Sequence, residues 1–223
     1  MPILTNDKIY IHMPKTGGTW ITECLKNGID GQMIGPHGHS PSRDLKRHDI
    51  RGKTLWGTVR DPWSWYVSWW AHCMKDDRTK RQLAIYGGGS TDFKDVLEGV
   101  LARDPKRCPD NHAVMWGTSK PVEDRRAYLS GDGGLYTWTF FHMYSDVKLL
   151  VDIQQLSAGL HALMGIQPTA PPSNTRSNKI PAPPREMYTD DMSDSIYDEE
   201  GFLISLLGYE EPFSTLKNPV TKV

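Results

Sequence analysis

The feature that most constrains the fold is a strand, a glycine loop and a helix in direct succession near the start of the chain. Residues 8–12, K-I-Y-I-H, are apolar, β-branched or aromatic apart from their ends and predict a short buried strand. The loop 13–18, M-P-K-T-G-G, follows, and residues 19–26 predict a helix that ends at Asn27-Gly28. A buried strand that passes through glycines into a helix is typical of α/β proteins.

Further strands and helices alternate along the chain. Strands are predicted at 54–59, 138–144 and 147–153, and helices at 63–73, from a Thr91 cap through 93–101, at 156–164 up to Gly165, and at 194–207. The segments 31–43, 74–90, 104–137 and 168–184 are rich in polar residues, glycine or proline and are predicted to be loop or irregular. We therefore predict a single α/β domain over 1–223, with a mostly parallel central sheet flanked by helices on both faces.

Composition excludes several classes of protein. The chain has 26 basic and 27 acidic residues and a net charge of -1, so no global field favours nucleic acid or a membrane surface. The three cysteines show no paired spacing, which argues against a disulfide framework or a structural zinc site. The N-terminus lacks a signal-peptide pattern, and no apolar run approaches the roughly 20 residues of a membrane span. The sequence predicts a soluble, cytoplasmic protein.

The glycine loop has the parts of a phosphate site. In the usual nucleotide-binding loop the lysine follows the glycines, whereas Lys15 precedes Gly17 and Gly18. A glycine turn at a helix N-terminus directs backbone N–H groups and the positive end of the helix dipole towards an anion. The charge of Lys15 and the hydroxyls of Thr16 and Thr19 would add to that site. The alternative is a plain strand-to-helix turn with an exposed lysine.

A second stretch, G-T-V-R-D-P-W-S-W-Y-V-S at 57–68, also ends a predicted strand and opens a helix. Arg60 stands at the junction, and Ser64 and Ser68 are four residues apart, hence on one helix face. Because ligands of open parallel sheets bind at the carboxyl ends of strands, two such ends predict a ligand with two separate phosphates. The alternative is a local ion pair between Arg60 and Asp61.

Together these stretches resemble a known family. P-K-T-G-G-T-W at 14–20 resembles the 5′-phosphosulfate loop of the sulfotransferases, which use 3′-phosphoadenosine 5′-phosphosulfate (PAPS), and R-D-P-W-S-W-Y-V-S at 60–68 is similar to their 3′-phosphate motif. The strand and helix at 147–165 and the closing I-Y-D-E-E-G-F-L-I-S-L-L-G-Y resemble the late part of carbohydrate-type members. The resemblance implies a P-loop-like sulfotransferase architecture and is weak between 74 and 137.

The resemblance also implies roles for individual residues. Lys15 would offset charge on the leaving phosphate oxygen, and Trp20 matches a tryptophan that stacks on adenine. The 5′-phosphate would be held by Thr16, Gly17, Gly18 and Thr19, and the 3′-phosphate by Arg60 and Ser68. The sequence departs from the pattern at Trp65, where many carbohydrate-type members have a second arginine.

The H-G-H segment supplies two candidate bases, His37 and His39. A histidine with an unperturbed pKa near 6.5 accepts a proton at neutral pH. Heparan-type 2-O-sulfotransferases have an H-G-H segment at this point, and the resemblance favours His39 as the base, with His37 supporting or replacing it. The alternative is a solvent-exposed pair. No Cys, Asp or Glu completes a metal-ligand set nearby, and His12 is interpreted as a core or near-site residue.

Two later segments complete the hypothesis. The loop 173–179, S-N-T-R-S-N-K, carries Arg176 and Lys179. Related enzymes close over the nucleotide with a basic loop in their C-terminal part, so the resemblance assigns these two residues to the cofactor. The alternative is a solvated linker. The region 74–137 would select the acceptor. The tryptophans of 63–70 are interpreted as core residues rather than a sugar-stacking surface.

The leading hypothesis is a metal-independent sulfotransferase that moves the sulfuryl group of PAPS to an acceptor hydroxyl, on a carbohydrate or a small molecule, and releases adenosine 3′,5′-bisphosphate (PAP). The first alternative is a P-loop nucleotide kinase or hydrolase, against which stands the absence of Lys-Ser/Thr after the glycines. The second alternative is a non-catalytic protein that binds adenosine phosphates. The sequence specifies neither the acceptor nor the oligomeric state.

Overall fold

The structure is a computed structural model of the 223-residue chain and describes residues 2–29, 31–34, 40–45, 50–109, 121–167 and 183–223. These residues belong to two compact units. The first, here the sheet unit, comprises Met1–Arg60, Phe140–Ser177 and Thr215–Val223. The second, here the helical unit, comprises Asp61–Thr139 and Asn178–Ser214. Each unit is described by itself.

The sheet unit contains one six-stranded sheet in the order β3-β1-β2-β4-β5-β6. The central pairs β2–β4 and β4–β5 are parallel, and the outer strands pair antiparallel. The strands are β1 (Ile3–Leu4), β2 (Lys8–Ile11), β3 (Gln32–Met33), β4 (Thr54–Val59), β5 (Leu149–Asp152) and β6 (Val220–Lys222). The prediction of an α/β fold whose sheet is parallel at its centre is confirmed.

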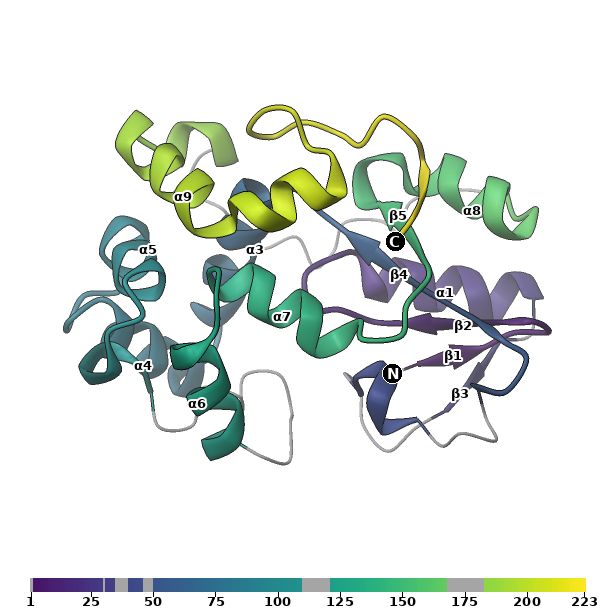
Figure 1. Cartoon of the computed structure of the whole chain (residues 1–223), viewed down its shortest axis with the longest axis horizontal. Helices are drawn as coiled ribbons and strands as arrows, with labels where there is room; N and C mark the ends of the chain where they lie inside the picture. The colour runs from purple at the N-terminus through teal and green to yellow at the C-terminus, as the bar shows by residue number, and fades with distance from the viewer. Residues whose placement is uncertain (1, 30, 35–39, 46–49, 110–120, 168–182) are drawn as a thin grey trace. The chain divides into compact units, whose positions relative to one another are not determined.

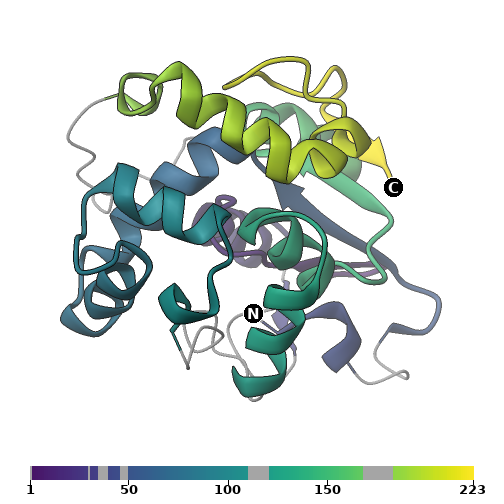
Figure 2. The ribbon, with the colours of Figure 1, turned by 60° about the vertical axis from the view of Figure 1, so that its left-hand side comes forward.

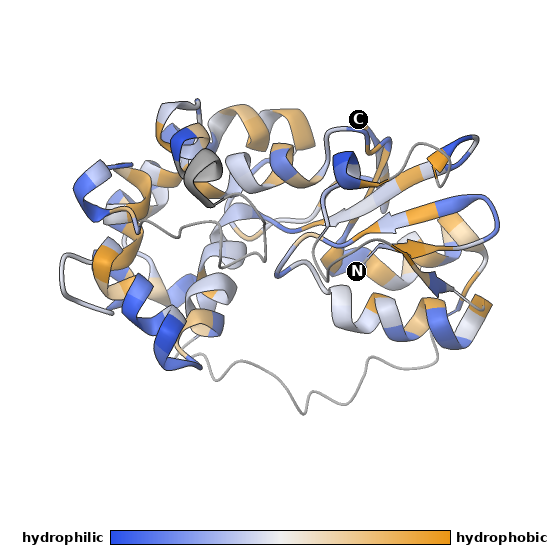
Figure 3. Ribbon diagram, turned by 90° about the horizontal axis from the view of Figure 1, so that it is seen from below, coloured by the Kyte–Doolittle hydropathy of each residue, from blue (hydrophilic) through white to orange (hydrophobic). Residues whose placement is uncertain are grey.

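Helices α1 (Gly18–Ile29) and α8 (Leu156–Met164) pack against the same face of this sheet (Figure 1). The strands contribute Tyr10, Trp56 and Val151 to the shared core, and the helices contribute Ile21, Leu25, Leu156 and Leu160, all of them buried. On the opposite face, the Tyr144 ring lies so close to Gly57 that a Cβ there would overlap it, so β4 requires glycine at that position. Hydrophobic residues recur along the central strands, as expected for strands covered by other elements (Figure 3).

The helical unit contains α3 (Pro62–Cys73), α4 (Asp77–Tyr86), α5 (Phe93–Leu101), α6 (Pro121–Ser130), the start of α7 (Leu135–Met143) and α9 (Asp190–Leu207). Helix α9 lies alongside α5 (Figure 2). Trp63, Trp65 and Trp69 are fully or almost fully buried, and the rings of Trp65 and Trp69 stack with centroids 6.2 Å apart. The interpretation of these tryptophans as core residues is confirmed.

Four short 3-10 helices complete the described secondary structure: η1 (Ser42–Asp44), η2 (Pro105–Arg107), η4 (Ile153–Gln155) and η5 (Pro184–Met187). The strand predicted at 54–59 and the helix at 156–164 are confirmed to the residue. Gly165 ends α8 in the left-handed conformation, with φ 71°. Helix α1 continues through Asn27-Gly28 to Ile29, so the predicted end of that helix is wrong.

Four other predictions of secondary structure are wrong. The predicted loop 74–90 contains α4, whose first turn is capped by the Asp76 carboxylate. Asp92, not Thr91, is the residue before α5. The predicted strand 138–144 lies mostly in α7, and the predicted irregular segment 104–137 contains α6 and the start of α7. Aromatic and β-branched residues suggested a strand at 138–144, but tertiary contacts at the start of α7 favour a helix there.

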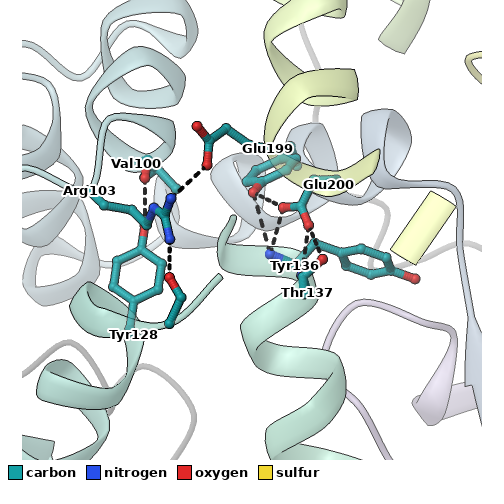
Figure 4. A network of polar contacts seen from close by, with 9 residues as sticks. Val100, Arg103, Tyr128, Tyr136, Thr137, Glu199 and Glu200 are labelled. Atoms are coloured by element: carbon teal, nitrogen blue, oxygen red, sulfur yellow. Dashed lines mark hydrogen bonds and ion pairs between the residues drawn. The ribbon is translucent and has the colours of Figure 1, made fainter. Parts of the chain in front are cut away.

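The contact that favours this helix is made by Glu200 of α9, whose buried carboxylate lies at the N-terminus of α7 (Figure 4). It accepts hydrogen bonds from the backbone N–H of Tyr136 at 3.0 Å, from the N–H of Thr137 at 2.8 Å and from the Thr137 hydroxyl at 2.5 Å. The Tyr66 hydroxyl donates a fourth bond. One carboxylate therefore satisfies two of the N–H groups that an α-helix leaves without an internal partner.

Among the helices described, none is long and apolar enough to cross a membrane.

Candidate anion-binding site

The predicted phosphate loop joins β2 to α1 and has the backbone of a tight turn. Lys15 has φ 67° and Gly17 has φ 83°, both in the left-handed region, which only glycine adopts without strain. Helix α1 then opens with a hydrogen bond from the Ile21 N–H to the Gly17 carbonyl, 3.2 Å long. The first N–H groups of this helix therefore face the loop, where they favour an anion.

A series of buried, hydrogen-bonded hydroxyl groups connects the loop to the strands β2 and β4. The Thr16 hydroxyl donates to the Met13 carbonyl at 2.8 Å and lies 2.9 Å from the Thr58 hydroxyl, which in turn lies 3.1 Å from the Tyr10 hydroxyl. Because Thr16 uses its only proton on Met13, Thr58 must donate to Thr16 and Tyr10 to Thr58. Any contact of Thr16 with a phosphate would therefore be made by its backbone N–H.

Two tyrosines of this region are neutral at physiological pH. Burial raises the pKa of Tyr10 well above its usual value, and it also raises that of Tyr144. The Tyr144 hydroxyl donates to the Thr58 carbonyl at 2.8 Å and accepts from the Thr58 N–H at 3.0 Å. Thr58 of β4 is thus bonded through its side chain and its backbone, and it connects the end of β4 to the loop after β2.

His12, at the end of β2, packs against the first turn of α1. An ideal Cβ built on Gly18 would overlap the His12 imidazole, so the ring occupies the space that a side chain at position 18 would need. The ring also stacks on Tyr10, with centroids 6.1 Å apart. His12 is therefore a neighbour of the loop 13–18, in agreement with its interpretation as a core or near-site residue.

This packing predicts a stability effect. Gly18→Ala should lower the free energy of unfolding by about 2 kcal/mol, because the new methyl group overpacks against His12. His12→Ala in the same chain should recover most of that loss, and urea denaturation of the two single variants and the double variant measures the coupling. Gly28→Ala in the same helix is the control, since its Cβ would lie 3.6 Å from Ile166, an ordinary contact. Equal effects of Gly18→Ala with and without His12 would contradict the assignment.

A surface hollow of about 310 Å³ lies beside the loop in the sheet unit. Trp20, in the first turns of α1, forms one wall, and residues 153–158, which follow β5, form the other. Ile153 also approaches Gly17, where an added Cβ would lie 3.0 Å from it. Trp20 is partly exposed and lines this hollow.

The predicted 3′-phosphate residues, Arg60 and Ser68, lie just before α3 and in the middle of it. Arg60 is the last residue of the sheet unit, whereas Asp61, Ser64 and Ser68 belong to the helical unit. Asp61 caps α3: its carboxylate accepts from the Ser64 N–H at 2.9 Å and from the Ser64 hydroxyl. The Ser64 hydroxyl is therefore engaged within α3, and Ser68 is buried one turn further on.

His37, His39, Arg176 and Lys179 lie outside the described residues. The chain directly after His39 is held in the sheet unit: Ser40 is buried, and the buried Ser42 hydroxyl lies 2.9 Å from that of Ser145 and accepts from the Asp146 N–H at 3.3 Å. Arg43 lies 3.1 Å from Nδ1 of His142. These contacts anchor the segment that follows the H-G-H motif to the unit that carries Lys15.

Sequence reasoning assigned no role to Thr58 and did not recognise Ile153 as a neighbour of the loop. Thr58 lies two residues before Arg60 within the predicted strand 54–59, where a threonine fits any strand. No sequence signal could link Ile153 to Gly17.

No cluster of three potential metal ligands occurs within the described ranges.

Neither the family models nor the curated proteins nor the solved structures gave a match to this chain.

Proposed function

We propose that the chain is a sulfotransferase that moves the sulfuryl group of PAPS to an acceptor hydroxyl and releases PAP. The observation that carries the proposal is the loop 13–18, in which Lys15, the Gly17 turn and the N-terminus of α1 converge at the carboxyl end of a parallel strand. The motif of this loop resembles that of the PAPS-dependent enzymes, as does R-D-P-W-S-W-Y-V-S after β4. The proposal includes the P-loop-like architecture of that family.

The hollow beside Trp20 supports an adenosine ligand. An adenine ring stacked on Trp20 would lie one helical turn from the loop, at a distance that a nucleotide spans between its base and its 5′-phosphate. The resemblance to the PAPS-dependent enzymes leads us to assign the 5′-phosphosulfate to the loop and the 3′-phosphate to Arg60 and Ser68. Arg176 and Lys179 are assigned to the same cofactor.

The chemistry follows from these positions. The acceptor hydroxyl attacks sulfur in line with the bond to the leaving phosphate oxygen, and a base removes its proton as the new S–O bond forms. His39 is the proposed base, and His37 is the alternative. Lys15 and the N–H groups of α1 offset the charge that develops on the leaving oxygen. The acceptor is a carbohydrate or a small molecule.

Calorimetry with PAP, ATP and AMP, each with and without Mg²⁺, tests the proposal. We expect PAP to bind at least tenfold more tightly than AMP, because only PAP carries a 3′-phosphate, and its affinity should not depend on Mg²⁺. Arg60→Ala should weaken PAP binding, whereas His39→Ala should leave PAP binding unchanged. A preference for Mg·ATP would instead support a nucleotide kinase or hydrolase.

A further inference from the structure

A groove between α5 and α9, within the helical unit, has an apolar floor and an acidic rim. Its volume is about 350 Å³, a size suited to a small organic ligand. The floor consists of the side chains of Leu97, Leu101 and Met192, which are largely buried. The groove is also lined by the hydroxyl residues Thr189 and Ser195 and by five charged residues, Lys94, Glu98, Asp191, Asp198 and Glu199.

Two of the four carboxylates have a basic partner. Lys94 lies 3.9 Å from Glu98 along α5, and Arg103 lies 3.2 Å from Glu199. Asp191 and Asp198 are exposed and form no ion pair with any residue that the structure describes. The groove therefore has a net negative charge that is concentrated at these two positions.

The spacing of Asp191 and Asp198 defines the shape of a complementary ligand. Seven residues along an α-helix correspond to about 10 Å and return to the same face of the helix. Met192 and Ser195 lie between the two carboxylates and line the same groove, opposite Leu97 and Leu101 of α5. A ligand that matches this surface has two positive ends about 10 Å apart and an apolar middle.

We propose that the groove between α5 and α9 binds a linear diamine, with one ammonium group at Asp191, the other at Asp198 and the alkyl chain over Leu97, Leu101 and Met192. Burial of the alkyl chain contributes to the affinity. The two ion pairs select ligands by length and discriminate against anions. Because both pairs are exposed to water, the affinity should be modest and should fall as the salt concentration rises.

Calorimetry on the full chain with diaminooctane tests the proposal, since its two nitrogens, when the molecule is extended, are separated by about the length of two helical turns, ~11 Å. We expect saturable binding with a dissociation constant of about 0.1–1 mM at low salt. Diaminobutane, octylamine and octanediol should each bind more weakly, because the first is too short and the others lack one or both charges. Asp191→Asn and Asp198→Asn should each weaken diaminooctane binding about three- to fivefold.

Asp194→Asn is the matched control, because it removes the same charge from an exposed position of α9 that does not line the groove. It should change the affinity less than either groove variant. Equal weakening by all three variants, or equal binding of octanediol and diaminooctane, would overturn the proposal. So would a concentration-dependent shift to a larger sedimenting species that Asp198→Asn abolishes, since the groove would then contact a second copy of the chain.

Discussion

If the chain is the sulfotransferase that we propose, replacing Lys15 with methionine is expected to slow sulfuryl transfer by about 100- to 1000-fold, the usual effect of removing one group that stabilises developing charge. Methionine keeps the length of the side chain and the same backbone cost at φ 67°, so the substitution removes the charge with little further change. Product release from labelled PAPS, in the presence of an acceptor found by screening, measures the rate. The affinity for PAP should fall much less than the rate, since the charge is needed most in the transition state.

Lys148→Met is the control for this prediction. Lys148 is an exposed cation of the sheet unit that lies just before β5. Its backbone N–H donates to the Leu55 carbonyl near the start of β4, so it lies at the opposite end of the central strands from the loop. Its loss should leave the transfer rate unchanged. If Lys15→Met and Lys148→Met behave alike, the lysine of the loop does not act on the leaving group.

Replacing Glu200 with alanine is expected to lower the free energy of unfolding by about 3 kcal/mol or more. The substitution leaves the Tyr136 and Thr137 N–H groups and the Thr137 and Tyr66 hydroxyls without their buried acceptor. Urea denaturation followed by circular dichroism measures the loss. Glu199→Gln is the control: Glu199 pairs with Arg103 at a partly exposed position, and its loss should cost under about 1 kcal/mol.

The same carboxylate should make stability depend on pH. Burial raises the pKa of Glu200 above its ordinary value of 4.5, although its hydrogen bonds act in the opposite direction. A folded-state pKa above the unfolded one means that the protonated group contributes stability, which is complete below the unfolded pKa and is lost as the pH rises through the folded pKa. The stability of the wild-type chain relative to Glu200→Gln should therefore decrease from pH 4.5 upwards. A constant difference would show that the fold does not perturb this group.

The parts of the fold that the sequence predicted are those with local signals. The strand 54–59 is an apolar, β-rich run, and the helix 156–164 ends at a glycine, so both were found to the residue. The aromatic segment at 138–144 was misassigned because the capping carboxylate of α7 comes from Glu200, about 60 positions along the chain. Local propensity carries no information about such a partner.

In the candidate site, too, the residues with a local sequence signal could be predicted and those that depend on distant partners could not. Lys15, Gly17 and Trp20 could be selected because they are adjacent in one motif whose physical parts are recognisable. The contacts of Thr58 with Thr16, and of His12 with Gly18, depend on strand register and on the path of α1. The sequence could predict that a residue such as Thr58 lies on a strand, but it could not predict that its side chain hydrogen-bonds to a neighbouring loop.

The chain of hydroxyls from Tyr10 through Thr58 to Thr16 has a kinetic consequence. These hydrogen bonds hold the loop from inside the protein, so we expect it to keep its shape when no ligand is bound. An anion would meet a surface that is already formed and would pay little entropy to order it. Encounter rather than rearrangement would then limit association, and differences in affinity among related ligands would arise mainly in how fast each one leaves.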